Sequence, residues 1–371
     1  MMEQKRLGDI ATYINGFAFK PEDRGTVGLP IIRIQDLTGN AYDLGFYAGN
    51  YPERIEINDG DVLISWSASL GVYVWDKGKA LLNQHIFKVV FDKCEVNREY
   101  FVYAVRYKLK EMESKTHGAT MKHIVKKDFD NTLIPFPTLE EQENIANLLD
   151  KISTIILVRQ QQLQKLDELV KARFVEMFGM PGTDTKGWGL QYLGTCCELN
   201  PKKGTDKRLV SGLSVSFVPM PAVSESGKID ASQIKAYDEV KTGFTYFAEN
   251  DVLFAKITPC MENGKGAVAV GLCNNIGFGS TEFHILRPIN NKSNPYWLYS
   301  LTSFDAFRKD AADNMTGSAG QRRVPAVFLE KYKVTLPPIE LQNQFAAFVE
   351  QTDKSKLSKY YICRYAYRHN S

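Results

Sequence analysis

The sequence lacks the cysteine and histidine patterns that hold metal ions or frameworks of disulfide bonds. Its six cysteines include no C-x-x-C pair, and the adjacent Cys196 and Cys197 are poorly placed to bridge each other. Its five histidines are scattered and offer neither a zinc spacing nor a base for a nucleophile. We therefore expect no metal site, and a chain that works in a reducing, cytoplasmic environment.

Long hydrophobic runs are also missing. The longest run of large aliphatic side chains, residues 155–158, is far too short to cross a bilayer, and the first ten residues contain no apolar core of a signal peptide. With 46 basic and 43 acidic residues, the net charge of +3 neither requires nor excludes a nucleic-acid partner. We expect no membrane contact, and an argument for nucleic-acid binding must rest on local charge.

The catalytic patterns in the chain are weak. Residues 294–297, Asn-Pro-Tyr-Trp, contain part of the N-P-P-Y motif of adenine methylases, but the second proline is missing and no glycine-rich cofactor loop follows a strand. We interpret Asn294 as a helix cap followed by proline in the first turn. Asp230 with Glu239 and Lys241 resembles a magnesium nuclease only in composition. The sequence therefore predicts no catalytic residue and no cofactor in this chain.

What the chain does contain is a very long helical pattern. Residues 140–178 include no proline or glycine, and apolar side chains recur at alternating steps of four and three, which is the period of a coiled-coil seam. Thr138 and Glu141 fit a capping box at its start, and Gly179 fits its end. At about 1.5 Å per residue the helix would run for roughly 58 Å and would need a partner helix. The apolar positions of the predicted seam are Ile145, Leu149, Ile152, Ile156, Leu163, Leu166, Val170 and Met177.

The second half of the chain repeats the first. After Gly179 the same order of β-rich runs and helical pattern begins again. Over residues 137–150, nine of fourteen positions match the positions 200 residues later, whereas the segments before these helix starts diverge. In the first copy the predicted strands are residues 29–34, 60–66, 71–75 and 85–91, followed by a helix at 99–112. Two modules therefore share one architecture and present different surfaces.

These helix starts carry a specific resemblance. Pro-Thr-Leu-Glu-Glu-Gln-Glu-Asn-Ile-Ala-Asn-Leu-Leu-Asp at 137–150 is matched by Pro-Pro-Ile-Glu-Leu-Gln-Asn-Gln-Phe-Ala-Ala-Phe-Val-Glu at 337–350. Together with Gly-Asp-Val-Leu-Ile-Ser at 60–65 and the stretch 163–171, they resemble the specificity subunit of type I restriction-modification systems. The resemblance covers nearly the whole chain. It implies an α+β fold in which two β-rich target recognition domains, in pseudo-repeat, are separated by long helices that form an antiparallel coiled coil.

The resemblance also implies a domain plan and a set of partners. Target recognition domain 1 would occupy residues 1–138, the central spacer helix 139–180, target recognition domain 2 181–337, and a shortened C-terminal spacer helix 338–371. Each domain would contact half of a split site in double-stranded DNA, and the helices would set the gap. Modification subunits would dock on the helices to methylate adenine, and restriction subunits would join for cleavage. S-adenosylmethionine, ATP and Mg²⁺ are expected only in those partner subunits.

The second helix departs from the family pattern. After Thr352, its seam positions are Lys356, Lys359, Cys363, Ala366 and Asn370. Because this apolar stripe fades, the central helix is expected to lack a full-length mate within the chain. We predict that part of the central seam, near residues 170–178, is exposed in the isolated chain and is covered by a partner.

Two basic clusters occupy equivalent places in the repeat, just before the end of each module. Lysine and arginine neutralise phosphates, and glycine-rich turns let the backbone approach them closely. The first cluster contains Lys115, Lys122, His123 and Lys126, and the second contains Ser318, Gln321, Arg322 and Arg323. Their recurrence favours DNA binding, while the alternative for each residue singly is a solvated loop charge.

Candidates for base recognition follow from hydrogen-bonding geometry. Arginine pairs with guanine through two hydrogen bonds, and asparagine or glutamine pairs with adenine in the same way. The candidates are Arg33, Gln35, Asn83 and Gln84 in the first copy, and Lys256, Asn263 and Lys265 in the second. Trp66 fits either a position beside DNA or a buried core aromatic.

Two alternatives to a DNA-specificity subunit stay open from the sequence. One is a coiled-coil assembly scaffold with no role in DNA binding, which the long helix alone would also fit. The other is a stand-alone DNA methylase or nuclease, which would need a cofactor loop or metal site that the sequence does not contain.

Overall fold

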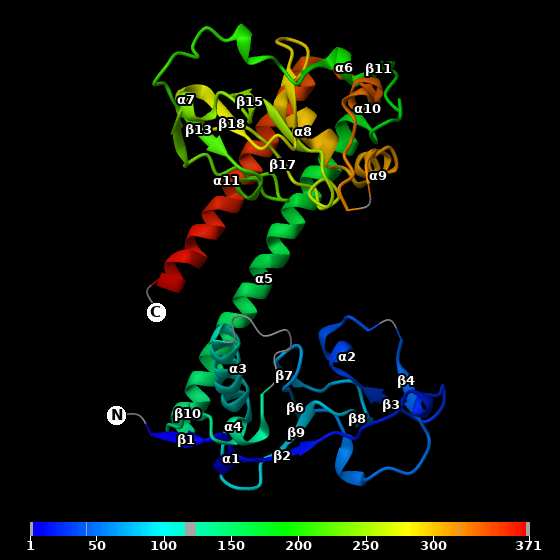
Figure 1. The fold of residues 1–371 in the computed structure, drawn as a ribbon, viewed down its shortest axis with the longest axis vertical. Helices are drawn as coiled ribbons and strands as arrows, with labels where there is room; N and C mark the ends of the chain where they lie inside the picture. Colours follow the sequence, from blue (N-terminus) through cyan, green and yellow to red (C-terminus); the bar gives the residue numbers. More distant parts are fainter. Residues whose placement is uncertain (1–2, 42, 116–123, 319, 369–371) are drawn as a thin grey trace. The chain divides into compact units, whose positions relative to one another are not determined.

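The computed structural model describes residues 3–41, 43–115, 124–318 and 320–368, with the backbone alone described for 113–115, 205 and 357–368. The chain divides into two compact units, unit 1 (Met1–Ile156) and unit 2 (Leu157–Ser371). The α-helix α5 (Leu139–Phe178) contributes residues to both units (Figure 1).

Helix α5 confirms the predicted central helix. It runs without interruption for 40 residues. At its start, Thr138 donates from its backbone N–H and its hydroxyl to the Glu141 carboxylate, both at 3.0 Å, and the Glu141 N–H donates back to Thr138 Oγ1 at 3.4 Å. This is the capping box expected from the sequence. At its end, Gly179 adopts a φ of +82°, the left-handed conformation that favours glycine.

Unit 1 is built on two four-stranded sheets. The first sheet is antiparallel throughout, whereas β3 and β8 in the second sheet pair in parallel. The first sheet has the order β2 (Thr12–Asn15), β9 (Ile86–Val90), β6 (Val62–Ser65), β7 (Gly71–Val74), and the second has β4 (Gly45–Tyr47), β3 (Leu29–Ile32), β8 (Ala80–Leu82), β5 (Glu56–Ile57). A two-stranded ribbon pairs β1 (Gln4–Arg6) with β10 (Leu133–Pro135). The helices are α1 (Leu7–Ile10), α2 (Ile34–Thr38), α3 (Arg98–Lys115) and α4 (Lys126–Asp130). Each predicted strand and the predicted helix at 99–112 are present within a few residues.

Unit 2 repeats this topology strand for strand. Its first sheet has the order β12 (Cys197–Leu199), β19 (Phe283–Pro288), β16 (Val252–Ala255), β17 (Gly266–Val268), and its second has β14 (Ile234–Ala236), β13 (Ser214–Val218), β18 (Ile276–Gly279), β15 (Thr245–Ala248). Here too one pair, β13 with β18, is parallel. The ribbon pairs β11 (Leu190–Tyr192) with β20 (Lys333–Thr335). The helices are α6 (Leu193–Cys196), α7 (Tyr237–Val240), α8 (Pro295–Ser303), α9 (Asp305–Asp313), α10 (Ala326–Lys331) and α11 (Ile339–Arg368). The internal repeat predicted from the sequence therefore extends to the fold.

A buried glutamine explains why the two helix starts are nearly identical. Gln142 and Gln342 are both fully buried. Gln142 Oε1 accepts a hydrogen bond from the Asn97 N–H at 2.9 Å, and its amide donates to the Pro137 carbonyl. Gln342 makes the same pair of bonds to the Asn294 N–H, at 2.8 Å, and to the Pro337 carbonyl. Each glutamine thereby joins its own helix start to the residue that precedes α3 or α8.

Asn294 is a helix cap, as predicted, and not part of a methylase motif. Its side-chain oxygen accepts a hydrogen bond from the Tyr296 N–H at 2.9 Å, and Pro295 is the first residue of α8. Asn97 does the same for Tyr100 in unit 1. Because both side chains satisfy free backbone donors at a helix start, their role is structural.

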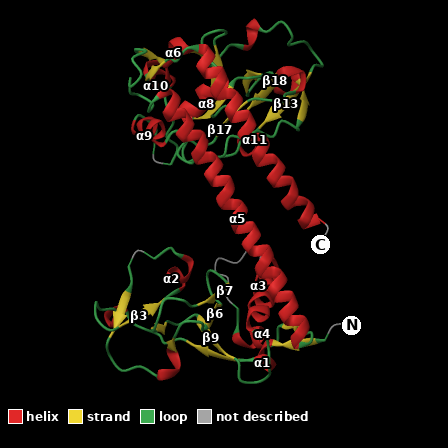
Figure 2. Ribbon diagram, turned by 180° about the vertical axis from the view of Figure 1, so that it is seen from behind, coloured by secondary structure: helices red, strands yellow, loops and turns green. Residues whose placement is uncertain are grey.

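Within unit 2, α11 packs antiparallel on the C-terminal part of α5 (Figure 2). Phe345 lies between Phe174 and Phe178, with ring centroids 5.5 and 5.4 Å apart. Farther along α11, Lys356 forms an ion pair of 2.7 Å with Asp167, so ascending positions on α11 meet descending positions on α5. The antiparallel helix pair expected from the resemblance is present over this segment.

The prediction that part of the central seam near residues 170–178 is exposed is wrong. Phe174 and Phe178 are each 2% exposed, and Val170 and Met177 pack against the same core. The apolar stripe of α11 fades only after Val349, which is itself buried, and by then it has covered this part of α5. Farther along α11, the charged seam position Lys356 pairs with Asp167 of α5. The loss of apolar side chains on α11 therefore does not expose α5 there.

Candidate nucleic-acid interface

One end of the first sheet in unit 1 joins three segments that are distant in the sequence. The Trp66 N–H, directly after β6, donates to the His85 carbonyl before β9 at 3.2 Å. The Ile124 N–H, before α4, donates to the Trp66 carbonyl at 3.0 Å. These bonds connect the segment after β6, the segment before β9 and the segment before α4.

The equivalent end of the sheet in unit 2 carries the same two hydrogen bonds. The Lys256 N–H, after β16, donates to the Glu282 carbonyl before β19 at 2.9 Å, and the Val324 N–H, before α10, donates to the Lys256 carbonyl at 2.9 Å. Backbone bonds of this kind do not depend on side-chain identity. The repeat therefore holds different side chains on one backbone framework. We call these places the first edge (Asn15, Trp66, Asn83, Gln84) and the second edge (Lys256, Glu282, Arg322, Arg323).

Trp66 at the first edge is half-buried. Its ring stacks on Phe87 with centroids 5.5 Å apart, and its Nε1–H donates to Asn15 Oδ1 at 3.3 Å. The ring therefore packs on the core while its edge reaches the surface, and a position beside DNA stays a prediction. Asn83 Oδ1 accepts from the Gln84 N–H at 2.9 Å, and Gln84 itself is exposed.

Arg33 is engaged by carboxylates of its own unit. Its Nε–H donates to Asp36 at 3.1 Å, and its Nη2 lies 3.5 Å from Asp43. The hydrogen bond to Asp36 raises the pKa of Arg33, and the side chain is only 18% exposed. These contacts fix the start of α2, so Arg33 has a structural role whether or not it meets DNA. Gln35, on α2, is exposed.

The first basic cluster is described only in part. Lys122 and His123 lie outside the described residues, and the side chain of Lys115 is not described either. Lys126 pairs with Asp130 at 2.8 Å and lies over the ring of Tyr13, 5.7 Å from its centroid. Lys126 is therefore anchored beside the core of unit 1.

The second basic cluster is brought together with Lys256. The Arg322 carbonyl accepts from the Thr258 N–H at 3.0 Å, and residues Thr316 and Arg323 exchange two backbone hydrogen bonds. Ser318 and Gln321 are exposed on the turn between them. Asn263 is exposed on the loop that follows β16, whereas Lys265 is directed to the Met220 carbonyl, 3.5 Å from its Nζ.

The two arginines of this cluster differ in how firmly they are held. The Arg323 guanidinium donates to Glu282 through Nε at 2.9 Å and Nη2 at 2.8 Å. Arg322 makes one long contact of 3.5 Å to Glu262. The Arg323 hydrogen bonds lower the pKa of Glu282, so this carboxylate is ionised at neutral pH.

A buried histidine holds the second basic cluster in place. His284, on β19, is 6% exposed, and its Nε2 lies 2.8 Å from the Val324 carbonyl. A carbonyl only accepts, so Nε2 carries the proton, and Nδ1 accepts from the Asn200 amide at 3.2 Å. Burial lowers the pKa of His284, which keeps the ring neutral at pH 7. The sequence offers no signal for this role, because His284 and Val324 are 40 residues apart.

Several exposed apolar side chains lie in the middle of α5. Leu148, Ile155, Ile156, Leu157 and Val158 are between 42% and 57% exposed. Among the predicted seam positions, Ile145, Leu149, Ile152, Leu163 and Leu166 are half-buried. In unit 1 the side of α5 that contacts α3 is polar, since Tyr103 donates to Asp150 at 2.7 Å.

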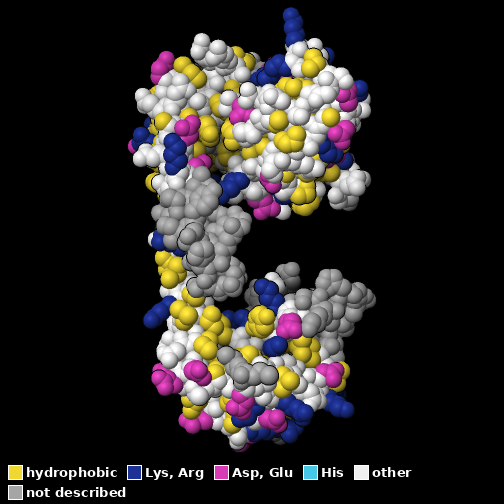
Figure 3. Space-filling model, turned by 90° about the vertical axis from the view of Figure 1, so that its left-hand side faces the viewer, with side chains coloured by type: hydrophobic (Ala, Val, Ile, Leu, Met, Phe, Trp, Pro, Cys, Tyr) yellow, Lys and Arg dark blue, Asp and Glu magenta, His cyan; other side chains and the backbone are white. Residues whose placement is uncertain are grey.

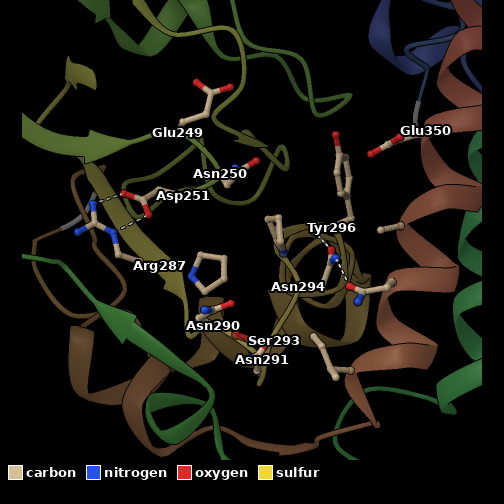
Figure 4. Close-up of a pocket in the computed structure, with 15 residues that line it drawn as sticks. Glu249, Asn250, Asp251, Arg287, Asn290, Asn291, Ser293, Asn294, Tyr296 and Glu350 are labelled. Atoms are coloured by element: carbon tan, nitrogen blue, oxygen red, sulfur yellow. Dashed lines mark hydrogen bonds and ion pairs between the residues drawn. The ribbon is translucent and has the colours of Figure 1, made fainter. Parts of the chain in front are cut away.

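A pocket of about 570 Å³ in unit 2 is lined by acidic side chains, unlike the basic second edge (Figure 4). It lies where the first turns of α11 meet the start of α8 and the turn between β15 and β16. Glu249 and Glu350 contribute to its lining, and the positive charge of Arg287 is matched by two hydrogen bonds to Asp251, at 2.8 and 2.7 Å. None of the described DNA-binding candidates lines it. Its acidic character opposes phosphate binding.

Surface charge, possible metal ligands and helix hydrophobicity complete the description of the surface. On the face shown in Figure 3, Lys and Arg side chains are interspersed with acidic and hydrophobic ones, so basic character is local. Among the described side chains, no group of three or more His, Cys, Asp or Glu could hold a metal ion. Every helix within the described ranges is too short or too polar to span a bilayer.

Comparison with known proteins points to one family. The family described as type I restriction modification DNA specificity domain matches residues 1–168 and 212–360. The specificity subunit of the type I restriction enzyme EcoAI of Escherichia coli is 36% identical over 214 residues, which cover 56% of this chain and 35% of that subunit. The corresponding subunit of EcoEI, also of E. coli, is 36% identical over 208 residues, or 34% of its length. The chain thus spans about a third of the length of these two relatives.

A more distant relative and a solved structure cover more of the chain. The MjaVIII specificity subunit of Methanocaldococcus jannaschii is 28% identical over 322 residues, which cover 81% of this chain and 74% of that subunit. The crystal structure of the S subunit of a type I restriction-modification system from M. genitalium has a TM-score of 0.54 and 14% identity, and the match covers 98% of this chain and 92% of that chain. The likeness to this solved structure concerns the fold alone.

Proposed function

Because the chain belongs to the type I restriction modification DNA specificity domain family, we propose that it recognises a split sequence in double-stranded DNA and supplies no catalytic residue of its own. The observation that carries this proposal is the shared backbone framework of the first and second edges. The same backbone framework would place each unit on its half-site in the same way. The different side chains at the two edges would then recognise different base sequences.

The second edge has the chemistry that a half-site requires. Lys256 and Arg322 lie on adjacent loops that are bonded to each other through the backbone. Cations on such loops neutralise phosphates and fix the position of the protein on the duplex. The first edge offers Trp66, Asn83 and Gln84 instead, which are suited to stacking and to hydrogen bonding with base edges.

Helix α5 is the element proposed to set the distance between half-sites. It is one helix of 40 residues that belongs in part to each unit. A helix of this length extends for about 60 Å and resists bending far better than a loop. The gap in the DNA site would then follow from the length of α5.

The exposed apolar side chains of α5 are the proposed docking place of the modification subunits. Leu148 and Ile155 are seven residues apart and so lie on one face of the helix, and both are more than half exposed. Apolar side chains gathered on one helix face are typical of a protein interface. Restriction subunits would join this assembly, and S-adenosylmethionine, ATP and Mg²⁺ would bind to the partner subunits.

The proposal is tested by the effect of salt on duplex binding. In the complex with modification subunits, Arg322→Ala is expected to weaken binding of every duplex several-fold, because a phosphate contact does not depend on sequence. The slope of log affinity against log salt should fall by about 1 in magnitude. Fluorescence anisotropy over a series of salt concentrations measures both quantities.

A matched control removes a charge from another surface of the same unit. Lys354 is exposed on α11, where no DNA contact is proposed, and Lys354→Ala should leave the slope unchanged. An assembled wild-type complex that binds all duplexes with equal affinity and little dependence on salt would favour the scaffold alternative instead.

A further inference from the structure

Arg323 is more firmly oriented than its neighbour Arg322. Glu282 accepts from its Nε and Nη2 at 2.9 and 2.8 Å, and the Gln321 carbonyl accepts from its Nη1 at 3.1 Å. Glu282 follows the turn before β19, and the framework bond from Lys256 holds its carbonyl. The planar guanidinium is thereby fixed on two sides, even though its side chain is 41% exposed.

Two N–H groups of the Arg323 guanidinium are left for a ligand. A guanidinium has five N–H groups, and three of those of Arg323 are used by Glu282 and Gln321. The two others, one on Nη1 and one on Nη2, have no acceptor among the described residues. Because Glu282 occupies the edge formed by Nε and Nη2, the free N–H of Nη2 belongs to the end formed by Nη1 and Nη2, and the proposed pair adds the Nη1 N–H at that same end.

The charge around Arg323 argues against a simple phosphate contact. Its carboxylate partner is ionised and weakens its attraction for a phosphate. What remains is a rigid pair of N–H donors, and such a pair matches the O6 and N7 acceptors of guanine in the major groove. Arg322, with one contact of 3.5 Å, keeps its charge and its freedom to follow a phosphate.

We infer that Arg323 recognises a guanine of the second half-site through these two N–H groups, and that Glu282 is the positioning residue that orients it. This inference rests on the proposed function and assigns base recognition and phosphate binding to two adjacent arginines. The same geometry explains why an acidic residue lies within a surface that binds DNA.

The test uses duplexes in which 7-deazaguanine replaces each guanine of the second half-site in turn, once that half-site is known. This base keeps its pairing with cytosine but lacks the N7 acceptor. For the wild-type chain in complex with modification subunits, one position should weaken binding by about tenfold. In the Arg323→Ala complex, which has no donor at this position, the same replacement should change binding less than twofold.

Two further variants separate the inference from its alternatives. Glu282→Gln should weaken discrimination at that position while raising affinity for unrelated duplexes, because no carboxylate then weakens the attraction of Arg323 for a phosphate. Arg322→Ala is the matched control and should leave the response to every 7-deazaguanine unchanged. Thermal melting of each variant verifies that the fold is kept.

Three results would overturn the inference. They are an Arg323→Ala complex as sensitive to 7-deazaguanine as the wild type, an Arg323→Ala complex equally weakened on all duplexes, and a second half-site that contains no G·C pair. Failure of the proposed function would look different, since the wild-type complex would then show no preference among unmodified duplexes of different sequence.

Discussion

Replacing both Leu148 and Ile155 by aspartate is expected to abolish stable assembly with the modification subunit and, with it, adenine methylation. Both side chains are more than half exposed on α5, so the folded chain tolerates the change. Burying one leucine or isoleucine at an interface contributes about 1.5–3 kcal/mol. The loss of two, with charges put in their place, should weaken assembly at least a hundredfold, or about 3 kcal/mol or more.

The neighbouring residues provide a matched control on another face of the same helix. Asn147 and Thr154 are also exposed and also seven residues apart. The double variant Asn147→Asp, Thr154→Asp adds the same two charges and should assemble normally. Sedimentation velocity of mixtures with purified modification subunit measures both variants. If the Leu148 and Ile155 variant assembled as well as the control, the docking place would have to be sought elsewhere on the chain.

Duplicating residues 160–166 within α5 is expected to lengthen the gap between half-sites while leaving both half-sites unchanged. Seven residues add about 10.5 Å of helix and turn its faces by only about 20°, so the seam continues. That length corresponds to about three base pairs of duplex at 3.4 Å each. The insertion lies before Asp167, the first residue of α5 with a described ion pair to α11, in which its partner is Lys356. The described contacts between α5 and α11 are therefore preserved.

A five-residue insertion at the same place separates length from rotation. It adds about 7.5 Å but turns the following residues by about 140°, because each residue of a helix advances by about 100°. We expect it to abolish methylation. The sites methylated in cells that carry each variant with its partner subunits reveal the gap directly. An unchanged gap after the seven-residue duplication would mean that α5 does not determine it.

The elements encoded by local patterns were predictable. The period of the apolar side chains and the absence of proline and glycine predicted α5, and the pair Thr138 and Glu141 predicted its start, since capping depends on residues three apart. The repeat of residues 137–150 at 337–350 predicted two similar units. The role of Gln142 and Gln342 within that repeat was visible only in the structure.

The contacts between distant residues were not predictable. Glu282 and Arg323 are 41 residues apart, and no pattern in one sequence indicates that one carboxylate will orient one arginine. The error at residues 170–178 has a related cause. The sequence showed that the apolar seam positions of α11 end after Val349. It did not show that Phe345 and Val349 share one core with Phe174 and Phe178 of α5.

The central claim is that two similar units, each presenting its own edge, recognise two half-sites at a fixed distance. Mapping N6-methyladenine across the genome of cells that carry this chain with its modification and restriction subunits tests that claim most directly. We predict one motif made of two short specified sequences that are separated by a gap of constant length and no sequence preference. A continuous motif, or two half-sites at variable distances, would contradict it.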